Sequence, residues 1–280
     1  PLCGGNFEYF SEDPYLSGKL AAAYVRGIQR GGALACVKHY AVNSQEFRRM
    51  ILDAEVDERA LREIYLTGFE IAVKEGKPGA LMTSYNQVNG LQSNENPQLM
   101  LEILRKEWGY DGLVVTDWGG SDDHIRGIQC RTTIEMPDPG LHAAREVMHA
   151  VERGELKEAE IDACLADYFR TLKRAAAQGK KVVPVDPLRQ HALARRAARE
   201  SAVLLKNDGI LPLTGEETVA LIGDFARVPR YQGAGSSLVN SRRVETLEGQ
   251  LSQRLGQKLI GYASGYARHG NDTKRQEARR

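Results

Sequence analysis

The sequence has few cysteines, and their spacing excludes the common cysteine-based sites. Its 280 residues contain four, at Cys3, Cys36, Cys130 and Cys164, with no CxxC pair and no Cys/His cluster. Zinc sites need closely spaced ligands, and disulfide-stapled domains need many cysteines in a short chain. We therefore expect no disulfide framework, no metal and no other cofactor.

Long apolar runs are also missing. No segment approaches the ~20 apolar residues of a membrane helix, and the first residues lack the basic and apolar regions of a signal peptide. The sequence predicts a soluble chain with no membrane partner and favours a cytoplasmic location. It begins at Pro1 rather than Met, within what already resembles a folded domain, so we expect a portion of a longer protein.

An excess of charge of either sign is absent as well. Lys and Arg number 38 and Asp and Glu 37, for a formal net charge of +1. This balance offers no general attraction to nucleic acid. The charge balance is compatible with a neutral substrate, and it leaves open whether the protein forms a homo-oligomer.

Short apolar segments that alternate with amphipathic ones indicate an α/β fold. Strands are expected at Ala33–Tyr40, Gly79–Tyr85 and Gly112–Trp118. Asp57–Glu75, with Gly76 closing its end, and Pro97–Trp108 have the pattern of the connecting helices. Strands that alternate with helices in this way predict a parallel sheet covered on both faces.

Polar residues follow each predicted strand. They are Lys38 and His39 after the first, Ser84, Tyr85 and Asn86 after the second, and Asp117 and Trp118 after the third. A (β/α) barrel places its active site at the carboxyl ends of parallel strands, although a doubly wound sheet binds ligands there too. We expect a partial (β/α) barrel followed by the start of an α/β sandwich domain.

The domain boundary is expected where composition changes. Residues 1–180 would form the C-terminal part of the barrel, 181–190 a proline-containing linker, and 191–280 an incomplete sandwich domain. Helices are expected over residues 157–179, 191–206 and 245–255, with a strand at Thr218–Gly223. The glycine-rich stretch 233–237 matches no phosphate-binding motif and is interpreted as a tight turn.

Asp117 is the strongest candidate for a catalytic residue. A carboxylate at the end of a buried strand needs partners or a ligand, although an Asp there can also cap the next helix. Trp118 beside it offers an apolar wall for a sugar ring. Lys38, His39 and Arg49 could bind hydroxyls, but each is equally compatible with an ordinary strand end or surface charge.

Several segments in order resemble the family 3 glycoside hydrolases, on the β-glucosidase side. These are GGNFEYFSEDPYLSG, CVKHYAVNSQEFRRM, DAEVDERALREIYL, LMTSYNQVNG, LVVTDWGG and ESAVLLKNDGILPL. The resemblance runs from about Asn6 to Leu213. It implies a catalytic barrel and an α/β sandwich that hydrolyse terminal non-reducing β-linked sugars with retention of configuration, on a β-linked glucoside or oligosaccharide substrate.

The resemblance also implies roles for single residues. Asp117 matches the nucleophile, and Tyr85 matches a tyrosine that hydrogen-bonds it. Lys38, His39 and Arg49 match groups that bind sugar hydroxyls, while Trp118 would form part of the sugar platform. Retaining chemistry needs a second carboxyl group as acid/base, and no convincing candidate is found among Glu216, Glu217, Glu245 and Glu248.

Three departures from the family pattern bear on activity. Gly5 stands where the family has an arginine that contacts sugar, and an early aspartate that binds the glucose ring would precede Pro1. In 129–140, Glu135-Met136-Pro137 keeps the end of the family's Gly-x-Asp-x-Glu-Met-Pro stretch and the residues before it differ. The alternatives are thus a catalytically impaired carbohydrate-binding remnant or a β-xylosidase. A β-N-acetylglucosaminidase is disfavoured because AVNSQE lacks its Gly/His-rich loop.

Overall fold

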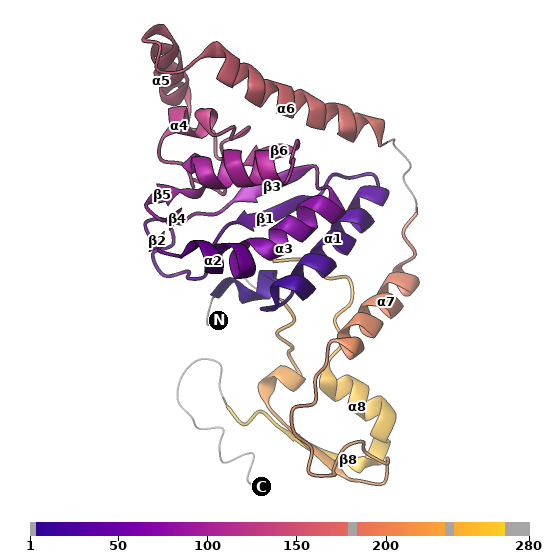
Figure 1. Cartoon of the computed structure of the whole chain (residues 1–280). Coiled ribbons are helices and arrows are strands. Elements are labelled where there is room, and N and C mark those ends of the chain that lie inside the picture. The colour runs from indigo at the N-terminus through magenta and orange to yellow at the C-terminus, as the bar shows by residue number, and fades with distance from the viewer. Residues whose placement is uncertain (1–3, 179–183, 233–237, 267–280) are drawn as a thin grey trace. The chain divides into compact units, whose positions relative to one another are not determined.

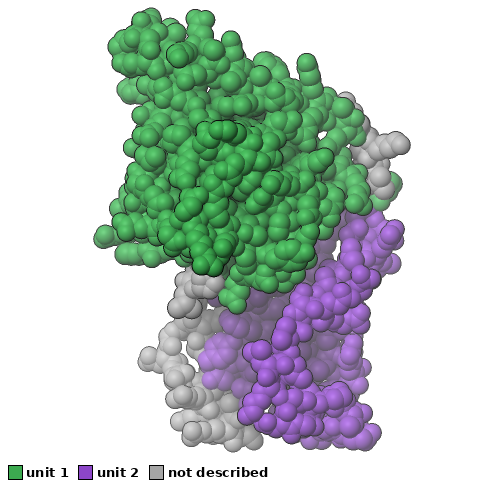
Figure 2. Space-filling model, viewed as in Figure 1, with its two compact units in different colours: residues 1–184 green, residues 185–280 purple. Residues whose placement is uncertain are grey.

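The computed structural model describes residues 4–178, 184–232 and 238–266. It divides into two units, residues 1–184 and 185–280, which are coloured separately in Figure 2. The glycine-rich stretch 233–237 and the basic C-terminal residues lie outside the described residues.

The first unit is built on a parallel sheet. Strands β1 (Cys36–Tyr40), β3 (Ala80–Thr83) and β6 (Leu113–Val115) lie in the order β1-β3-β6, and both neighbouring pairs run parallel. The expectation of a parallel α/β arrangement is therefore confirmed. A small second sheet consists of β2 (Asp53–Ala54), β4 (Gln87–Val88) and β5 (Leu91–Gln92).

Helical segments connect and cover these strands (Figure 1). Those before β6 are η1 (Gly4–Glu8), α1 (Pro14–Arg30), α2 (Glu58–Ala60), η2 (Leu61–Leu66), α3 (Thr67–Ile71), η3 (Ala72–Gly76), η4 (Ser93–Glu95) and η5 (Gln98–Glu107). After β6 come α4 (His124–Gln129), α5 (Leu141–Glu152) and α6 (Glu158–Ala177). The helix predicted at Pro97–Trp108 is confirmed, since η5 is capped by these two residues.

The helical run from α2 to η3 agrees with its prediction except at its end. Asp57 caps it by accepting from the Ala60 amide at 2.9 Å. Gly76 does not supply the left-handed terminus, because that conformation belongs to Lys77 at φ 54°. Gly76 instead lies against α1, where an added Cβ would meet Val25 Cβ at 3.1 Å and Ala22 Cα at 3.2 Å.

The hydrophobic core of this unit lies between the sheet and its helices. Tyr40 is fully buried and forms edge-to-face contacts with Phe69 and Trp108, at centroid distances of 5.3 and 5.9 Å. Its hydroxyl donates to the Leu99 carbonyl at 2.8 Å, which satisfies the polar group. Other large side chains of the core include Leu61, Leu66, Leu81, Leu99, Met100, Ile103, Leu104, Tyr110 and Val114.

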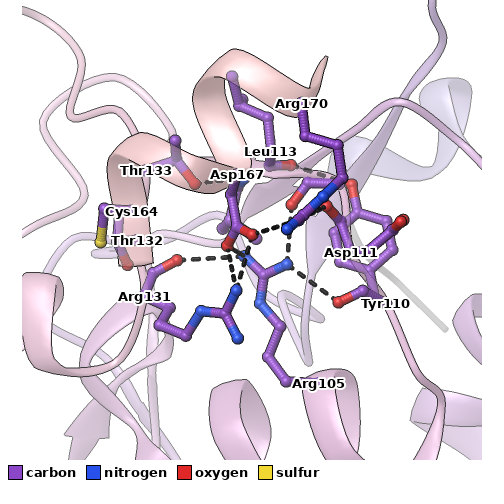
Figure 3. A network of polar contacts seen from close by, with 12 residues as sticks. Arg105, Tyr110, Asp111, Leu113, Arg131, Thr132, Thr133, Cys164, Asp167 and Arg170 are labelled. Carbon is purple, nitrogen blue, oxygen red and sulfur yellow. Dashed lines mark hydrogen bonds and ion pairs between the residues drawn. The ribbon is translucent and has the colours of Figure 1, made fainter. Parts of the chain in front are cut away.

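A buried ion cluster holds α6 against this core (Figure 3). Asp167 is fully buried, and its carboxylate lies 2.7 Å from Arg131, 2.7 Å from Arg170 and 3.2 Å from Arg105. Arg105 also donates to the Tyr110 and Gly112 carbonyls just before β6. The cluster therefore links α6 and η5 to the strand that leads to Asp117.

The second unit contains α7 (Pro187–Glu200), β7 (Val219–Ile222), η6 (Asp224–Ala226), α8 (Leu247–Leu255), η8 (Gly256–Lys258) and β8 (Leu259–Ala263). β7 and β8 pair in parallel. The expectation of a helix over 191–206 is wrong in its bounds, because Asp186 caps the chain and Pro187 opens the helix. The strand at Thr218–Gly223 and the helix at 245–255 are confirmed within two residues.

Candidate active site

The candidate residues gather where the three parallel strands end. β1 ends at Tyr40, β3 at Thr83 and β6 at Val115, and parallel register brings these ends to one edge of the sheet. His39, Tyr85 and Asp117 meet there.

Asp117 lies at the centre of this group. Its side chain is 14% exposed, and its Oδ2 lies 3.3 Å from His39 Nε2. Its Oδ1 accepts from the Trp118 amide at 2.7 Å. Tyr85 lies near enough for the charge of the carboxylate to act on its hydroxyl.

Tyr85 and His39 respond electrostatically to this carboxylate. Burial and the charge of Asp117 raise the pKa of Tyr85, so its hydroxyl keeps its proton. Burial lowers the pKa of His39 despite the opposing charge of Asp117. A neutral imidazole with its proton on Nε2 presents N–H to Asp117 and leaves Nδ1 as an acceptor.

Two residues without a predicted role contact His39 from its other side. The Tyr9 hydroxyl lies 3.3 Å from His39 Nδ1, and Glu8 Oε2 lies 3.9 Å from the same atom. Both belong to the segment GGNFEYFSEDPYLSG. That segment indicated the family, but no local pattern in it indicates contact with a histidine thirty positions away.

Lys38 shares Glu8 with His39. Its Nζ lies 3.6 Å from Glu8 Oε2, so Lys38 and His39 approach one carboxylate although they are consecutive in β1. The regular register with β3 breaks between Val37 and Tyr40, which accounts for the departure from strict alternation. Glu8 thus engages the cation that the sequence assigned to sugar binding.

Arg49 stacks on Tyr85. Its guanidinium carbon lies 4.3 Å from the Tyr85 ring centroid, and Nη1 pairs with Glu46 at 2.6 Å. The stacking holds a positive charge over the face of the Tyr85 ring. Gly5, by contrast, brings no side chain to the site.

Trp118 presents its indole to solvent. The residue is 63% exposed, and the loop that follows turns through Gly119 at φ 79°. The Gly119 amide donates to the Met136 carbonyl at 2.6 Å, and the Gly120 amide to the Asp117 carbonyl at 2.9 Å. Backbone hydrogen bonds thus set the place of this residue.

The segment that includes Glu135-Met136-Pro137 lies alongside β6. Ile134 bridges to Val115 in parallel, and the Met136 amide donates to Thr116 Oγ1 at 2.9 Å. Arg131 occupies the position of the family's glycine, has a left-handed φ of 61°, and reaches Asp167. The altered residues therefore still support the strand end that carries Asp117.

A cavity of about 720 Å³ opens beside β1. Its lining includes Glu8, Tyr9, Lys38 and His39, and continues along α1 and the 64–69 segment. Asp117 and Tyr85 are not among its lining residues, so the cavity adjoins the His39 side of the site.

The four glutamates considered as acid/base occupy local contacts in the second unit. Glu216 pairs with Lys258 at 3.0 Å, Glu245 with Arg243 at 2.5 Å and Glu248 with Arg227 at 2.5 Å. Glu217 accepts from the Thr214 amide and hydroxyl. Across the described part of the chain, no group of three His, Cys, Asp or Glu side chains is arranged to hold a metal, and no helix is long and apolar enough to span a membrane.

Comparison with known families decides the relationship. Residues 3–167 match the model of the glycosyl hydrolase family 3 N terminal domain, and residues 202–280 match that of its C-terminal domain. The chain belongs to glycoside hydrolase family 3. The family resemblance found in the sequence is thus confirmed.

The relatives of this family 3 chain include enzymes named for more than one activity. It is 44% identical over 268 residues to thermostable beta-glucosidase B of Acetivibrio thermocellus, covering 95% of this chain and 36% of the relative. It is 39% identical over 265 residues to an exo-alpha-(1->6)-L-arabinopyranosidase of Bifidobacterium longum, covering 91% and 35%. The chain thus spans about a third of the length of these relatives.

Solved family 3 structures share its fold. Beta-glucosidase 3B from Thermotoga neapolitana in complex with glycerol matches with a TM-score of 0.84 and 37% identity, over 91% of this chain and 37% of that one. A beta-glucosidase from Bifidobacterium adolescentis matches with a TM-score of 0.89 and 36% identity, over 100% of this chain and 41% of that one.

Proposed function

We propose that this chain supplies the nucleophile-bearing part of a retaining β-glucosidase that releases terminal non-reducing β-D-glucosyl residues from a β-linked glucoside or oligosaccharide. The observation that carries the proposal is the environment of Asp117, whose carboxylate accepts from the Trp118 amide, lies 3.3 Å from His39 Nε2 and has Tyr85 close by. The names and structures of the family 3 relatives support the same activity.

The proposed reaction has two steps. Asp117 attacks the anomeric carbon and forms a glycosyl-enzyme ester while the bond to the leaving oxygen breaks, and that oxygen takes a proton. Water then cleaves the ester with a second inversion, which restores the original configuration. Tyr85 and His39 would hold Asp117 in place, and Lys38, Arg49 and Trp118 would contact the sugar.

In the proposed architecture, residues 1–180 form part of a (β/α) barrel, 181–190 link it to the next domain, and 191–280 begin an α/β sandwich. The parallel order β1-β3-β6 and the strand-end position of Asp117 support the barrel. No acid/base is assigned to a residue of this chain.

Trapping with a 2-deoxy-2-fluoro-glucoside that carries an activated leaving group tests the nucleophile. A good leaving group reduces the need for acid assistance in the first step. Mass spectrometry should locate the adduct on Asp117, and Asp117→Asn should abolish it. Asp111→Asn is the matched control, because Asp111 lies before the same strand and is exposed. An adduct formed equally well by Asp117→Asn would refute the assignment.

A second candidate is a carbohydrate-binding remnant without turnover. Gly5 favours it because this position contributes no guanidinium, and Glu8 engages Lys38. This candidate predicts glucose binding by calorimetry without any adduct. Parallel assays with aryl β-glucoside and aryl β-xyloside distinguish the β-xylosidase alternative.

A further inference from the structure

Glu95, at the end of η4, is a buried carboxylate that the proposed chemistry does not use. The residue is 5% exposed. Its Oε1 accepts from the Asp122 amide at 2.7 Å, the Asp123 amide at 2.9 Å and the Ser121 hydroxyl at 3.2 Å. One oxygen atom therefore binds three consecutive residues of the chain.

Those three residues end the loop that carries Trp118. The loop leaves Asp117 and passes through Gly119 and Gly120, two residues with wide conformational freedom. Its first part is fixed by the Trp118 amide on Asp117 and the Gly119 amide on Met136. The exposed indole adds little packing, so the place of Trp118 depends on how both ends of the loop are held.

The segment that carries Glu95 is itself firmly attached to the sheet. Ser93 Oγ lies 2.6 Å from Ser84 Oγ, directly before Tyr85. Thr132 Oγ1 donates to the Asn94 carbonyl at 2.9 Å, and Arg126 Nε to the Glu95 carbonyl at 3.1 Å. Glu95 thus connects the end of β3 to the loop that follows β6.

We propose that Glu95 is a positioning residue, which fixes Trp118 relative to Asp117 by holding the end of the 118–123 loop. The inference rests on the proposed glucosidase function, in which Trp118 contacts the sugar. Glu95 itself contacts no reacting atom. Its effect is expected in substrate binding, since Asp117 keeps its own contacts with His39 and Tyr85 when Glu95 is changed.

Three variants distinguish geometry from charge. Glu95→Ala removes the acceptor, Glu95→Asp withdraws it by one methylene, and Glu95→Gln can keep an oxygen in the place of Oε1. For an activated aryl β-glucoside, we expect KM to rise about tenfold in Glu95→Ala, with kcat changed less than about threefold. In Glu95→Gln we expect KM to stay close to the wild-type value. Glu102→Gln is the control, since Glu102 is an exposed glutamate on η5 whose carboxylate pairs with Lys106 at 2.8 Å, away from the 118–123 loop.

A second readout does not depend on turnover. The chain has two tryptophans, so fluorotryptophan labelling gives two ¹⁹F resonances, of which Trp118→Phe identifies one. We expect Glu95→Ala and Glu95→Asp to shift the Trp118 resonance while buried Trp108 stays unchanged, with Glu95→Gln close to wild type. If Glu95→Ala does not fold, the KM and the Trp118 resonance of Glu95→Asp test the proposal instead.

Unchanged Trp118 resonance and unchanged KM in Glu95→Asp would overturn the proposal, as would a Glu95→Gln variant as impaired as Glu95→Ala. The proposed function is tested separately by the trapping experiment. It fails if the wild-type chain forms no adduct on Asp117, and this result does not depend on the Trp118 resonance.

Discussion

The two units of this chain bury their side chains very differently. Residues 1–184 enclose a core around Tyr40 and Ile103 and a fully buried Asp167 with three arginine partners. Among the described residues of 185–280, only Leu221 and Ala226 are buried apolar side chains, and α7 and α8 contain no buried residue. Leu205 in this second unit is 92% exposed.

This contrast explains why the candidate site belongs to the first unit. A catalytic group must be held within fractions of an ångström, and such precision comes from packed elements with satisfied polar groups. The ion pairs of the second unit, such as Lys258–Glu216, include exposed side chains, and such pairs stabilise a fold only weakly. Both tryptophans, Trp108 and Trp118, belong to the first unit. Their fluorescence therefore follows its unfolding selectively, whereas circular dichroism follows both units.

The largest effect is expected from breaking the buried ion cluster. Asp167→Ala leaves three arginines without their shared carboxylate and should lower the free energy of unfolding of the first unit by about 3–5 kcal/mol. Urea titration followed by tryptophan fluorescence measures it. Glu216→Gln, which removes an exposed ion pair in the second unit, is the control and should leave the curve unchanged. If Asp167→Ala and Glu216→Gln lowered the free energy of unfolding equally, the two units would not differ in how their ion pairs stabilise them.

A cavity in the core should lower the free energy of unfolding by a somewhat smaller amount. Ile103→Ala deletes a fully buried side chain and should destabilise the first unit by about 2–5 kcal/mol. Leu188→Ala on α7, where the side chain is 74% exposed, should change stability by less than about 0.5 kcal/mol. A large loss from Leu188→Ala by circular dichroism would show that α7 is packed in solution.

A helix cap tests the second unit directly. Thr246 Oγ1 accepts from the Gly249 amide at 3.0 Å at the start of α8. Thr246→Ala should destabilise this helix by about 1 kcal/mol, and Thr246→Ser should restore it. The change should appear in circular dichroism and leave the tryptophan transition in place. A shifted tryptophan transition would show that the units unfold together.

The smallest effect concerns pH. Burial lowers the pKa of His39 below its unfolded value of 6.5, so the unfolded chain binds more protons below that pH. Stability of the first unit should therefore be fully present above pH 6.5 and decrease as pH falls through the folded pKa. His39→Gln should flatten this dependence between pH 7.5 and 5.5. An unchanged slope in the variant would assign the effect to other groups.

The sequence predicted the parts of the fold that local pattern controls. Apolar runs located β1, β3 and β6, and the helical pattern over Pro97–Trp108 located η5, because strand burial and helix termini leave short-range signals. The site residues came from the family resemblance, and their proximity at one sheet edge followed from the parallel strands.

What the sequence could not supply are contacts set by tertiary packing. Tyr9 reaches His39 across thirty positions, Glu95 reaches Asp122 across 27, and Asp167 reaches Arg131 across 36. Nothing in the local composition marks these pairs, since each depends on how separate βα units pack. The start of α7 was mispredicted for a different reason. Asp186 and Pro187 form a local helix start, but these residues were interpreted as part of the linker.

Arg131 illustrates how a chain can depart from its family's pattern and keep its geometry. The left-handed backbone at this position suits glycine, and a larger residue there carries a conformational cost. Here the side chain that causes the cost also contacts Asp167, which offsets it. Substitutions at positions 131 and 167 should therefore have coupled effects on stability. A mutant library that introduces glycine at position 131 should vary position 167 at the same time.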